Sequence, residues 1–367
     1  MPSTIPDTMA AVLLTGHGGM DKLEYREDVP VPRPGPGEVL IRVAAAGVNN
    51  TDINTRIGWY SKNVTGDTSS GAAGGYQEAD TDDASWGGKP LEFPRIQGAD
   101  CCGRIVAVGD GVDEGRIGER VIVRGCLLGY SGGRPFESQW LGSEKDGGFA
   151  QYTTAPAVDT FAIDCDWSDA ELGAVPCSYS TAEGLLHRSG VGADDRVLVT
   201  GASGGVGSSA VQLARARGAE VVAVAGASKA DWVREHGAGR VIDRDADPVE
   251  ALGEESVSVV IDLVGGSGWP RLLEVLRRGG RYATSGAIAG PIVELDLRTL
   301  YLKDLSLFGS THQDDGVFQG LIQHIEQGRI RPVVSQTYPL RDIVQAQEDF
   351  LAKRHTGKLV LIPPQDD

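Results

Sequence analysis

The strongest chemical signal in the sequence is a glycine-rich turn between an apolar run and a helical pattern. Val197–Thr200 has the composition of a buried strand, and after it come Gly201, Gly204 and Gly207. From Gly205 onward the apolar residues recur at helical spacing. Glycines in such a turn let the backbone approach a pyrophosphate, and the helix N-terminus offers unpaired N–H groups to it. The motif predicts a dinucleotide-binding turn; a tight strand-to-helix turn without a ligand is the alternative.

The residues after the next strand indicate which dinucleotide is bound. An NAD-binding chain carries a carboxylate about 20 residues beyond the glycines, where it hydrogen-bonds the ribose hydroxyls. Here the strand Glu220–Ala225 is followed by Gly226, Ser228 and Lys229, with no carboxylate. A hydroxyl and an ammonium group suit a 2′-phosphate, so the sequence favours NADPH. The alternative is that Lys229 is a solvated residue in the first turn of a helix.

The elements that must position these residues follow two patterns. From Met9 to about Ala157, short apolar and β-branched runs are separated by Pro and Gly, which is typical of a partly open β-barrel. From about Arg196 strands alternate with helices, which predicts an α/β domain with a doubly wound parallel sheet. Trp269–Arg278 is predicted to be one of these helices and Arg281–Ser285 one of the strands. The tail, with two strand patterns around a helix, is assigned to the first domain.

Composition and charge exclude several classes of protein. The chain has 367 residues, enough for two or three domains, with 51 acidic and 34 basic residues and a formal net charge of −17. That charge repels phosphate backbones and anionic lipids, so we expect neither nucleic-acid nor membrane-surface partners. The five cysteines form no regular framework and the first residues lack the pattern of a signal peptide. Both observations favour reduced thiols and a cytoplasmic location.

Six segments, including the glycine turn, carry a family pattern and follow one another along the chain in the family's order. They are Gly47–Asp52, Phe93–Gly103, Gly147–Tyr152, Ser180–Glu183, Gly201–Gly207 and His355–Leu361. In these segments the sequence resembles the medium-chain dehydrogenase/reductase superfamily, and within it the quinone oxidoreductase branch. The resemblance implies a GroES-like catalytic domain from residues 1–157 and 330–367, a Rossmann NADP-binding domain from residues 158–329, and an active site in the cleft. It also implies a symmetric homodimer formed along the last Rossmann strand, here near Arg281–Leu297.

The same resemblance adds cofactor contacts to those predicted from the glycine turn. Thr181 matches the position that contacts the nicotinamide ring, and Arg244 lies near the place where NADPH-using members present a tyrosine to the 2′-phosphate. Turns at Val264–Gly266 and Ser285–Ala289 end parallel strands and should run beside the nicotinamide half. The predicted cofactor-binding residues are Thr181, Gly201, Ser203, Gly204, Gly205, Val206, Gly207, Gly226, Ser228, Lys229, Arg244, Val264, Gly286, Ala287 and Ile288.

The residues at the family's zinc positions are not a zinc-binding set. Zinc-dependent members present a Cys, a His and a second Cys, and here Asn49, Ala99 and Cys177 stand at the matching places. A catalytic zinc takes three protein ligands and a water, and one thiolate does not supply them. We therefore expect no metal, and interpret Cys177 as a small apolar residue of the pocket.

Asn49, Asp52 and Tyr60 are the predicted catalytic residues, because their segment resembles the Asn-x-x-Asp…Gly-x-Tyr pattern of quinone reductases and mitochondrial-type enoyl reductases. By this resemblance Tyr60 donates or orients a proton, Asn49 holds the substrate oxygen or the nicotinamide ribose, and Asp52 orients its neighbours. Without a metal, hydride passes from NADPH to an activated C=C bond or quinone, and hydrogen bonds stabilise the enolate. The alternatives are a zinc-type alcohol dehydrogenase with altered ligands and an NADP-binding protein without turnover.

Two stretches, 61–93 and 125–146, fit neither structural pattern. The first holds six glycines and six acidic residues, the composition of a solvated loop. Because it begins just after Tyr60, it is also a candidate substrate wall or lid near the active-site mouth, and its acidic residues disfavour very anionic substrates such as acyl-CoA. The second stretch carries aromatic residues that indicate packing against another segment: Tyr130, Phe136 and Trp140.

Overall fold

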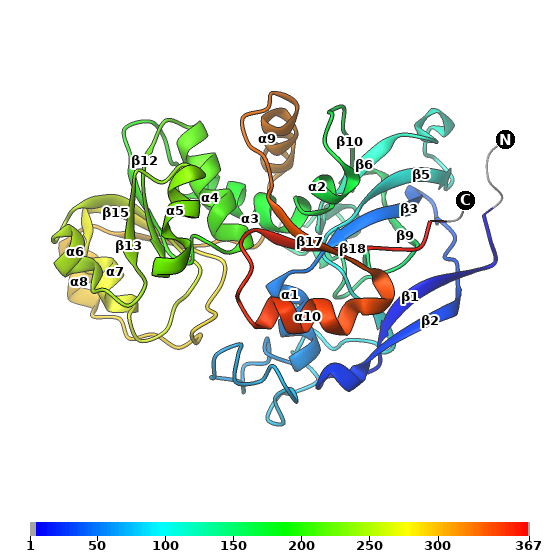
Figure 1. Ribbon diagram of the computed structural model, residues 1–367, viewed down its shortest axis with the longest axis horizontal. Helices are drawn as coiled ribbons and strands as arrows, with labels where there is room; N and C mark the ends of the chain where they lie inside the picture. The colour runs from blue at the N-terminus through cyan, green and yellow to red at the C-terminus, as the bar shows by residue number, and fades with distance from the viewer. Residues whose placement is uncertain (1–4, 135, 366–367) are drawn as a thin grey trace. The chain divides into compact units, whose positions relative to one another are not determined.

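The computed structural model describes residues 5–134 and 136–365, and the chain folds into two compact units. The β-rich unit contains the chain up to Val64, Ser70–Cys177 and the residues from Pro332 onward; the parallel-sheet unit contains Thr65–Ser69 and Ser178–Arg331 (Figure 1). The N-terminal part and the C-terminal tail thus share one unit, as predicted. The predicted boundary at residue 157 moves to Cys177, because β10 (Thr160–Ala162) pairs with β6 (Arg120–Val123) in the β-rich unit.

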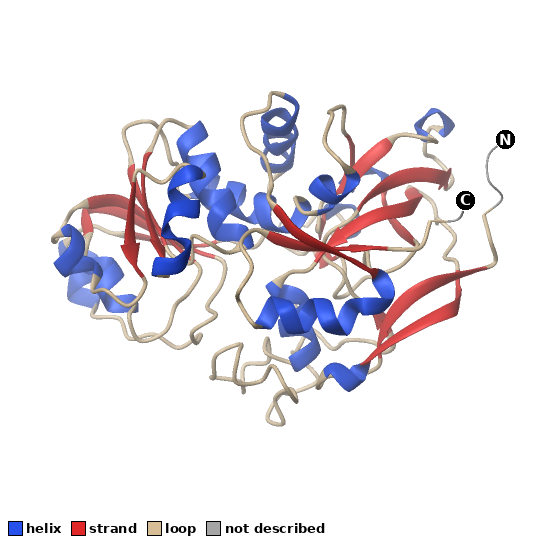
Figure 2. Cartoon of the chain, in the orientation of Figure 1, coloured by secondary structure: helices blue, strands red, loops and turns tan. Residues whose placement is uncertain are grey.

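The β-rich unit is built around one long central strand. Within the described residues its main sheet has the order β10-β6-β5-β3-β18-β17, and β9 also pairs with β3. The strand β3 (Glu38–Gly47) runs antiparallel to β5, β9 and β18, so the last strand of the chain is joined to an early one (Figures 1 and 2). The other strands of the unit are β1 (Thr8–Leu14), β2 (Leu23–Pro30), β4 (Arg95–Ile96), β5 (Cys102–Val108), β7 (Cys126–Leu127), β8 (Gln139–Trp140), β9 (Tyr152–Pro156), β17 (Val334–Pro339) and β18 (Lys358–Ile362).

Helices close the β-rich unit and complete its core. The helix α10 (Ile343–Leu351) places Ile343 and Ala346 in the same buried cluster as Val39 and Ile41 of β3. This shared core explains why the C-terminal tail belongs with the first domain, since burial of apolar surface is the main favourable term in folding. The remaining helices that begin here are α1 (Asn50–Ile57), α2 (Asp169–Gly173) and α3 (Pro176–Arg188), and α3 continues into the parallel-sheet unit.

The parallel-sheet unit has the strand order β13-β12-β11-β14-β15-β16, with every neighbouring pair parallel. All six residues of β14 (Val257–Asp262) are buried, as expected for a strand covered on both faces. This is the doubly wound Rossmann order predicted from the sequence. The other elements are β11 (Arg196–Val199), α4 (Gly205–Ala216), β12 (Glu220–Ala225), α5 (Ala230–Glu235), β13 (Arg240–Asp243), α6 (Pro248–Leu252), α7 (Trp269–Glu274), β15 (Leu276–Thr284), α8 (Leu297–Leu302), β16 (Ser306–Gly309) and α9 (Asp315–Glu326).

One helix is shorter than its sequence pattern predicts. The helix predicted over Trp269–Arg278 ends at Glu274, and β15 already begins at Leu276, which pairs with Val257. Gly279 adopts a φ of 70°, a left-handed conformation that a helix cannot continue through. The prediction was wrong for these residues because pairing with β14 outweighs their helical periodicity.

The insertion at residues 61–93 is packed against the rest of the fold. The buried Arg56 guanidinium of α1 donates hydrogen bonds to the carbonyl oxygens of Gly18 at 2.7 Å and Ala72 at 3.3 Å, and to Gln347 Oε1 at 2.9 Å. Within the parallel-sheet unit, the Thr68 N–H donates to the Ile288 carbonyl oxygen at 3.2 Å. The insertion is therefore held at defined points. Among the described residues, no helix is both long and apolar enough to cross a membrane.

Candidate active site

The glycine turn has the conformation that a dinucleotide site requires. Gly201 follows β11 with a φ of 59°, and α4 begins at Gly205 after Gly204. A Cβ on Gly207 would lie 2.2 Å from the Gly201 carbonyl oxygen, so only glycine lets the helix approach the strand this closely. The first N–H groups of α4 have no partner inside the helix. N–H groups at a helix N-terminus can bind an anion such as a pyrophosphate.

The predicted nicotinamide turns lie at the carboxyl ends of neighbouring central strands. A Cβ on Gly201 would lie 3.4 Å from Val264 Cγ2, and the Ala289 N–H donates to the Val264 carbonyl oxygen at 2.9 Å. A Cβ on Gly286 would lie 3.4 Å from the Leu263 carbonyl oxygen. Strand order reverses between β11 and β14, and ligands of such sheets bind at that switch point. The turns after β11, β14 and β15 are therefore adjacent. Thr181 belongs to a different element, the helix α3.

A buried carboxylate that sequence reasoning missed fixes the shape of these turns. Asp262 is fully buried at the end of β14 and accepts hydrogen bonds from Thr200 Oγ1 at 2.6 Å and Tyr282 OH at 2.7 Å. It also accepts N–H bonds from Val264 at 3.0 Å and Gly265 at 3.2 Å. Each bond satisfies a polar group that would otherwise be buried without a partner. The one sequence signal was an acidic residue ending an apolar strand.

Positive charge gathers where the adenosine ribose is expected. A Cβ on Gly226, after β12, would lie 3.7 Å from Arg244 Cζ, so this guanidinium lies beside the glycine. Burial, and then repulsion by Arg244, lower the pKa of Lys229. Asp245 Oδ2 lies 3.9 Å from Arg244 Nε, at the margin of an ion pair, and both side chains are exposed. The structure thus brings Gly226, Lys229 and Arg244 together as predicted, with Ser228 exposed between them.

The predicted catalytic residues lie at the start of α1 in the β-rich unit. Asp52 is buried and accepts N–H bonds from Asn49 at 2.8 Å and Ala99 at 3.2 Å. Burial raises the pKa of Asp52 to about 7; the Asp100 carboxylate adds to the rise, while these N–H groups and the Lys358 ammonium oppose it. Both carboxylate oxygens are engaged in fixing the backbone around Asn49 and Ala99. This geometry agrees with the orienting role predicted for Asp52.

The Asn49 amide is held by a buried ion pair that the sequence did not reveal. Asn49 Nδ2 donates to Asp100 Oδ2 at 2.8 Å and lies 3.2 Å from the Gly47 carbonyl oxygen, while Asn49 Oδ1 accepts from Lys358 Nζ at 2.5 Å. Lys358 Nζ also lies 3.0 Å from Asp100 Oδ2, and both side chains are buried. The only signal for Lys358 was its place in the family segment His355–Leu361.

The residues at the zinc-ligand positions do not fit a zinc ion. Both ends of the Asn49 amide are occupied, one by an ammonium group, and Ala99 has no donor atom. Cys177 donates its N–H to Asp100 Oδ1 at 2.6 Å, and burial, reinforced by Asp100, raises the pKa of its thiol and disfavours the thiolate that binds metals. In the part of the chain that the structure describes, no three His, Cys, Asp or Glu side chains are grouped to hold a metal.

The Tyr60 hydroxyl lies beside this cluster. It donates to Thr51 Oγ1 at 3.0 Å, and burial raises the pKa of the phenol, with smaller contributions from Cys177 and Asp52. A phenol with a raised pKa keeps its proton at neutral pH, so it can donate a hydrogen bond or a proton. The ring of Tyr60 is half-buried, which leaves part of it accessible.

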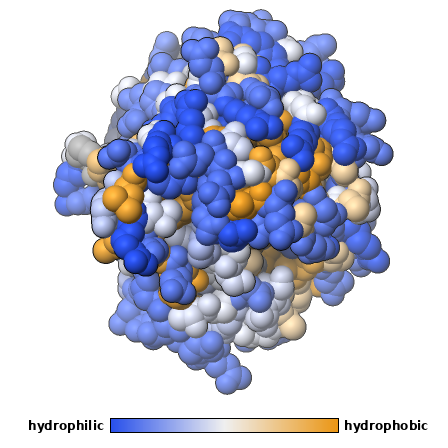
Figure 3. All heavy atoms as spheres, turned by 90° about the vertical axis from the view of Figure 1, so that its left-hand side faces the viewer, coloured by the Kyte–Doolittle hydropathy of each residue, from blue (hydrophilic) through white to orange (hydrophobic). Residues whose placement is uncertain are grey.

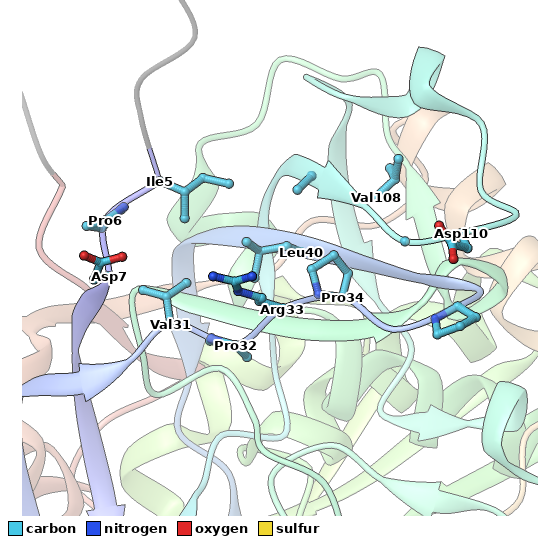
Figure 4. Close-up of a pocket in the computed structure, with 13 residues that line it drawn as sticks. Ile5, Pro6, Asp7, Val31, Pro32, Arg33, Pro34, Leu40, Val108 and Asp110 are labelled. Carbon is cyan, nitrogen blue, oxygen red and sulfur yellow. The ribbon is translucent and has the colours of Figure 1, made fainter.

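A separate groove lies elsewhere in the β-rich unit. Its volume is about 490 Å³, and the residues lining it include Ile5, Val31, Arg33, Leu40, Val108 and Asp110 (Figure 4). None of the candidate site residues belongs to its described lining. The groove is therefore not part of the candidate active site.

Comparison with known proteins identifies the family. Residues 35–164 match the alcohol dehydrogenase GroES-like domain, and residues 205–327 match the zinc-binding dehydrogenase domain. The quinone oxidoreductase of Rattus norvegicus is 30% identical, with 96% of this chain and 98% of that protein aligned.

The chain belongs to the medium-chain dehydrogenase/reductase superfamily, in its quinone oxidoreductase-like branch. A putative alcohol dehydrogenase from Sinorhizobium meliloti 1021 is 46% identical, with a TM-score of 0.87 over 99% of this chain and 98% of the other. A crotonyl-CoA carboxylase/reductase in complex with NADP is 26% identical, with a TM-score of 0.81 over 98% and 95% of the two chains. These comparisons confirm the predicted family and fold class, and the protein is an oxidoreductase that uses a nicotinamide cofactor and a small-molecule substrate.

Proposed function

We propose that this protein is an NADPH-dependent oxidoreductase that delivers hydride to an activated C=C bond or a quinone without zinc. The observation that carries the proposal is the Asn49–Asp100–Lys358 network, which stands where a catalytic zinc would need ligands. A metal-free site does not strongly acidify an alcohol, whereas an electron-poor π-system accepts hydride at carbon without a Lewis acid. A relative that reduces crotonyl-CoA and binds NADP supports the same chemistry.

Each group of this chain then has a defined task. The glycine turn Gly201–Gly207 would hold NADPH, which would supply the hydride. The Tyr60 hydroxyl rotates its single proton from Thr51 Oγ1 to the acceptor oxygen as negative charge develops there, and the acceptor gains one hydride and one proton overall. Asn49, which was expected to hold the substrate oxygen or the nicotinamide ribose, is a positioning residue in this proposal because both ends of its amide are already engaged. Asp52 holds the start of α1 in place.

Two alternatives remain distinct from this proposal. One is a zinc-type alcohol dehydrogenase with altered ligands, and the similarity to a putative alcohol dehydrogenase favours alcohols as its substrates. An NADP-binding protein without turnover would keep the glycine turn but would not need Tyr60.

The insertion at 61–93 is proposed as part of the substrate wall, because it follows Tyr60 directly and is anchored to α1 by Arg56.

The proposed assembly is a symmetric homodimer. The predicted dimer strand near Arg281–Leu297 was the wrong one, because β15 pairs with both β14 and β16 and the edge strand is β16. Large apolar side chains are exposed on β16 and before it. Ile292 is 70%, Leu297 64%, Tyr301 62% and Leu302 58% exposed. Apolar side chains are also visible among the polar surface in Figure 3. An edge strand flanked by exposed apolar residues suits a self-complementary interface.

The cysteines are free thiols, which supports the proposal of a reducing, cytoplasmic location.

An acceptor panel tests the proposed reaction. The parent protein is expected to oxidise NADPH with quinones and enones, to contain far less than one equivalent of zinc, and to keep its activity after chelation. Tyr60→Phe should lower kcat at least about tenfold, because it removes the proton donor. Steady-state kinetics measure the rate of NADPH oxidation and kcat, and metal analysis measures the zinc content. Stoichiometric zinc bound through Cys177, or turnover of alcohols alone, would contradict the proposal.

Titration with both nucleotides tests the cofactor preference. NADPH should bind at least about tenfold more tightly than NADH, a difference of ~1.4 kcal/mol, because Lys229 and Arg244 face the 2′-phosphate. Lys229→Ala should narrow the difference, while Lys22→Ala in the β-rich unit should leave it unchanged. Equal dissociation constants for the two nucleotides in the parent protein would refute this preference.

Light scattering at micromolar concentration tests the assembly. The parent protein should have twice the chain mass, and Leu302→Glu should shift it toward the monomer because a charge in an apolar interface is costly. Arg134→Glu, on the exposed surface of the β-rich unit, is the control and should remain dimeric. A monomeric parent protein is the result that rules this assembly out.

A further inference from the structure

Two segments outside the family pattern are fastened to each other by one carboxylate. Gly87, in the insertion, donates its N–H to Glu144 Oε1 at 2.7 Å, and Trp140 donates its N–H to Glu144 Oε2 at 3.0 Å. The Trp86 N–H adds a bond to Ser143 Oγ at 3.2 Å. Hydrogen bonds to an ionised carboxylate are stronger than neutral ones. Glu144 therefore fixes the residues around Trp86 against the 125–146 stretch.

The same contact brings together a group of aromatic rings that includes the Tyr60 phenol. Trp86 stacks on the buried Trp140, with ring centroids 4.2 Å apart and planes 16° apart. Trp86 is also nearly parallel to Tyr60, with centroids 6.4 Å apart and planes 4° apart. Trp59 meets Tyr60 edge-on at 5.7 Å. Trp86, Tyr60 and Trp59 are each half-buried, so part of each residue remains accessible.

We infer that Trp86 determines acceptor specificity by offering a flat aromatic wall beside the Tyr60 hydroxyl to planar, ring-bearing acceptors. The inference rests on the proposed function and names its substrate class: neutral quinones and cyclic enones in preference to acyclic enones or acyl-CoA thioesters. A conjugated ring stacked on an indole gains contact over its whole face, whereas a short acyclic chain gains little.

The position of the wall follows from contacts on both sides of Tyr60. The Tyr60 hydroxyl is bound to Thr51 and lies near Asp52 and Cys177, so this edge of the ring belongs to the proposed acceptor site. The face of the ring is aligned with Trp86. An acceptor that places its oxygen at the phenol thus lies next to the indole.

The charge of the insertion supports a neutral acceptor. Residues 61–93 hold six acidic residues and two lysines, and the chain carries a formal net charge of −17. Three exposed or half-exposed acidic side chains, Asp80, Asp82 and Asp83, lie shortly before Trp86 in the chain. A field of this sign disfavours the phosphates of a coenzyme A ester.

Substitution of Trp86 tests the inference without removing the apolar character of the site. Trp86→Leu should lower kcat/KM for 1,4-naphthoquinone and 2-cyclohexen-1-one about tenfold, mainly through KM, because leucine cannot stack. For the acyclic 3-penten-2-one kcat/KM should stay within about twofold of the parent value, and the NADPH dissociation constant should not change. Trp86→Phe, which keeps a flat ring, should retain the preference for cyclic acceptors.

The controls separate this inference from the function on which it rests. Trp232→Leu removes a tryptophan that stacks on His236 in the parallel-sheet unit, and it should leave both acceptor classes unchanged. An equal loss for cyclic and acyclic acceptors in Trp86→Leu, or no loss for either, overturns the role of Trp86 while the reductase function stands. A parent protein that reduces neither class overturns the proposed function itself.

Discussion

The buried ion pair between Asp100 and Lys358 is the contact on which the proposed acceptor site depends. The Asp100 carboxylate accepts hydrogen bonds from Asn49, Lys358 and the Cys177 N–H, and so joins the start of α1, strand β18 and the start of α3. A buried charge without its partner strongly destabilises the folded state, so α1, β18 and α3 must all be in place for the Asp100–Lys358 pair to form. The same carboxylate explains Gly47, because a Cβ there would lie 2.4 Å from Asp100 Oδ2.

This constraint also decides what chemistry the site can perform. The ammonium group of Lys358 and the amide of Asn49 use the space and the lone pairs that metal ligands would need. What the site offers instead is a protonated phenol held by Thr51 and flanked by aromatic rings. In the parallel-sheet unit Asp262 has a comparable role, because one buried carboxylate shapes the turns after β11 and β14. In each unit, one buried carboxylate thus fixes the backbone around the candidate site residues.

Local sequence patterns predicted the fold and the glycine turn. They did not predict contacts between residues that lie far apart in the chain. Gly201 and Gly207 could be predicted because strand, glycines and helix lie within a dozen residues, and their conformation depends on that segment alone. The bond from Lys358 to Asn49 spans 309 positions, so no local pattern contains it. The contact of Trp86 with Trp140 joins two segments without periodicity. The helix predicted to reach Arg278 failed for the same reason, since pairing of Leu276 with a distant strand outweighed local propensity.

The fate of the transferred hydride tests the central claim most directly. The claim is that a metal-free site with the Tyr60 phenol directs hydride to an activated carbon–carbon double bond. Reduction of 2-cyclohexen-1-one with NADPH deuterated at C4 of the nicotinamide, on the face that the enzyme uses, can be followed by NMR of the product. The account predicts cyclohexanone with deuterium at the β-carbon. Deuterium at the carbinol carbon of 2-cyclohexen-1-ol would show carbonyl reduction and would contradict it.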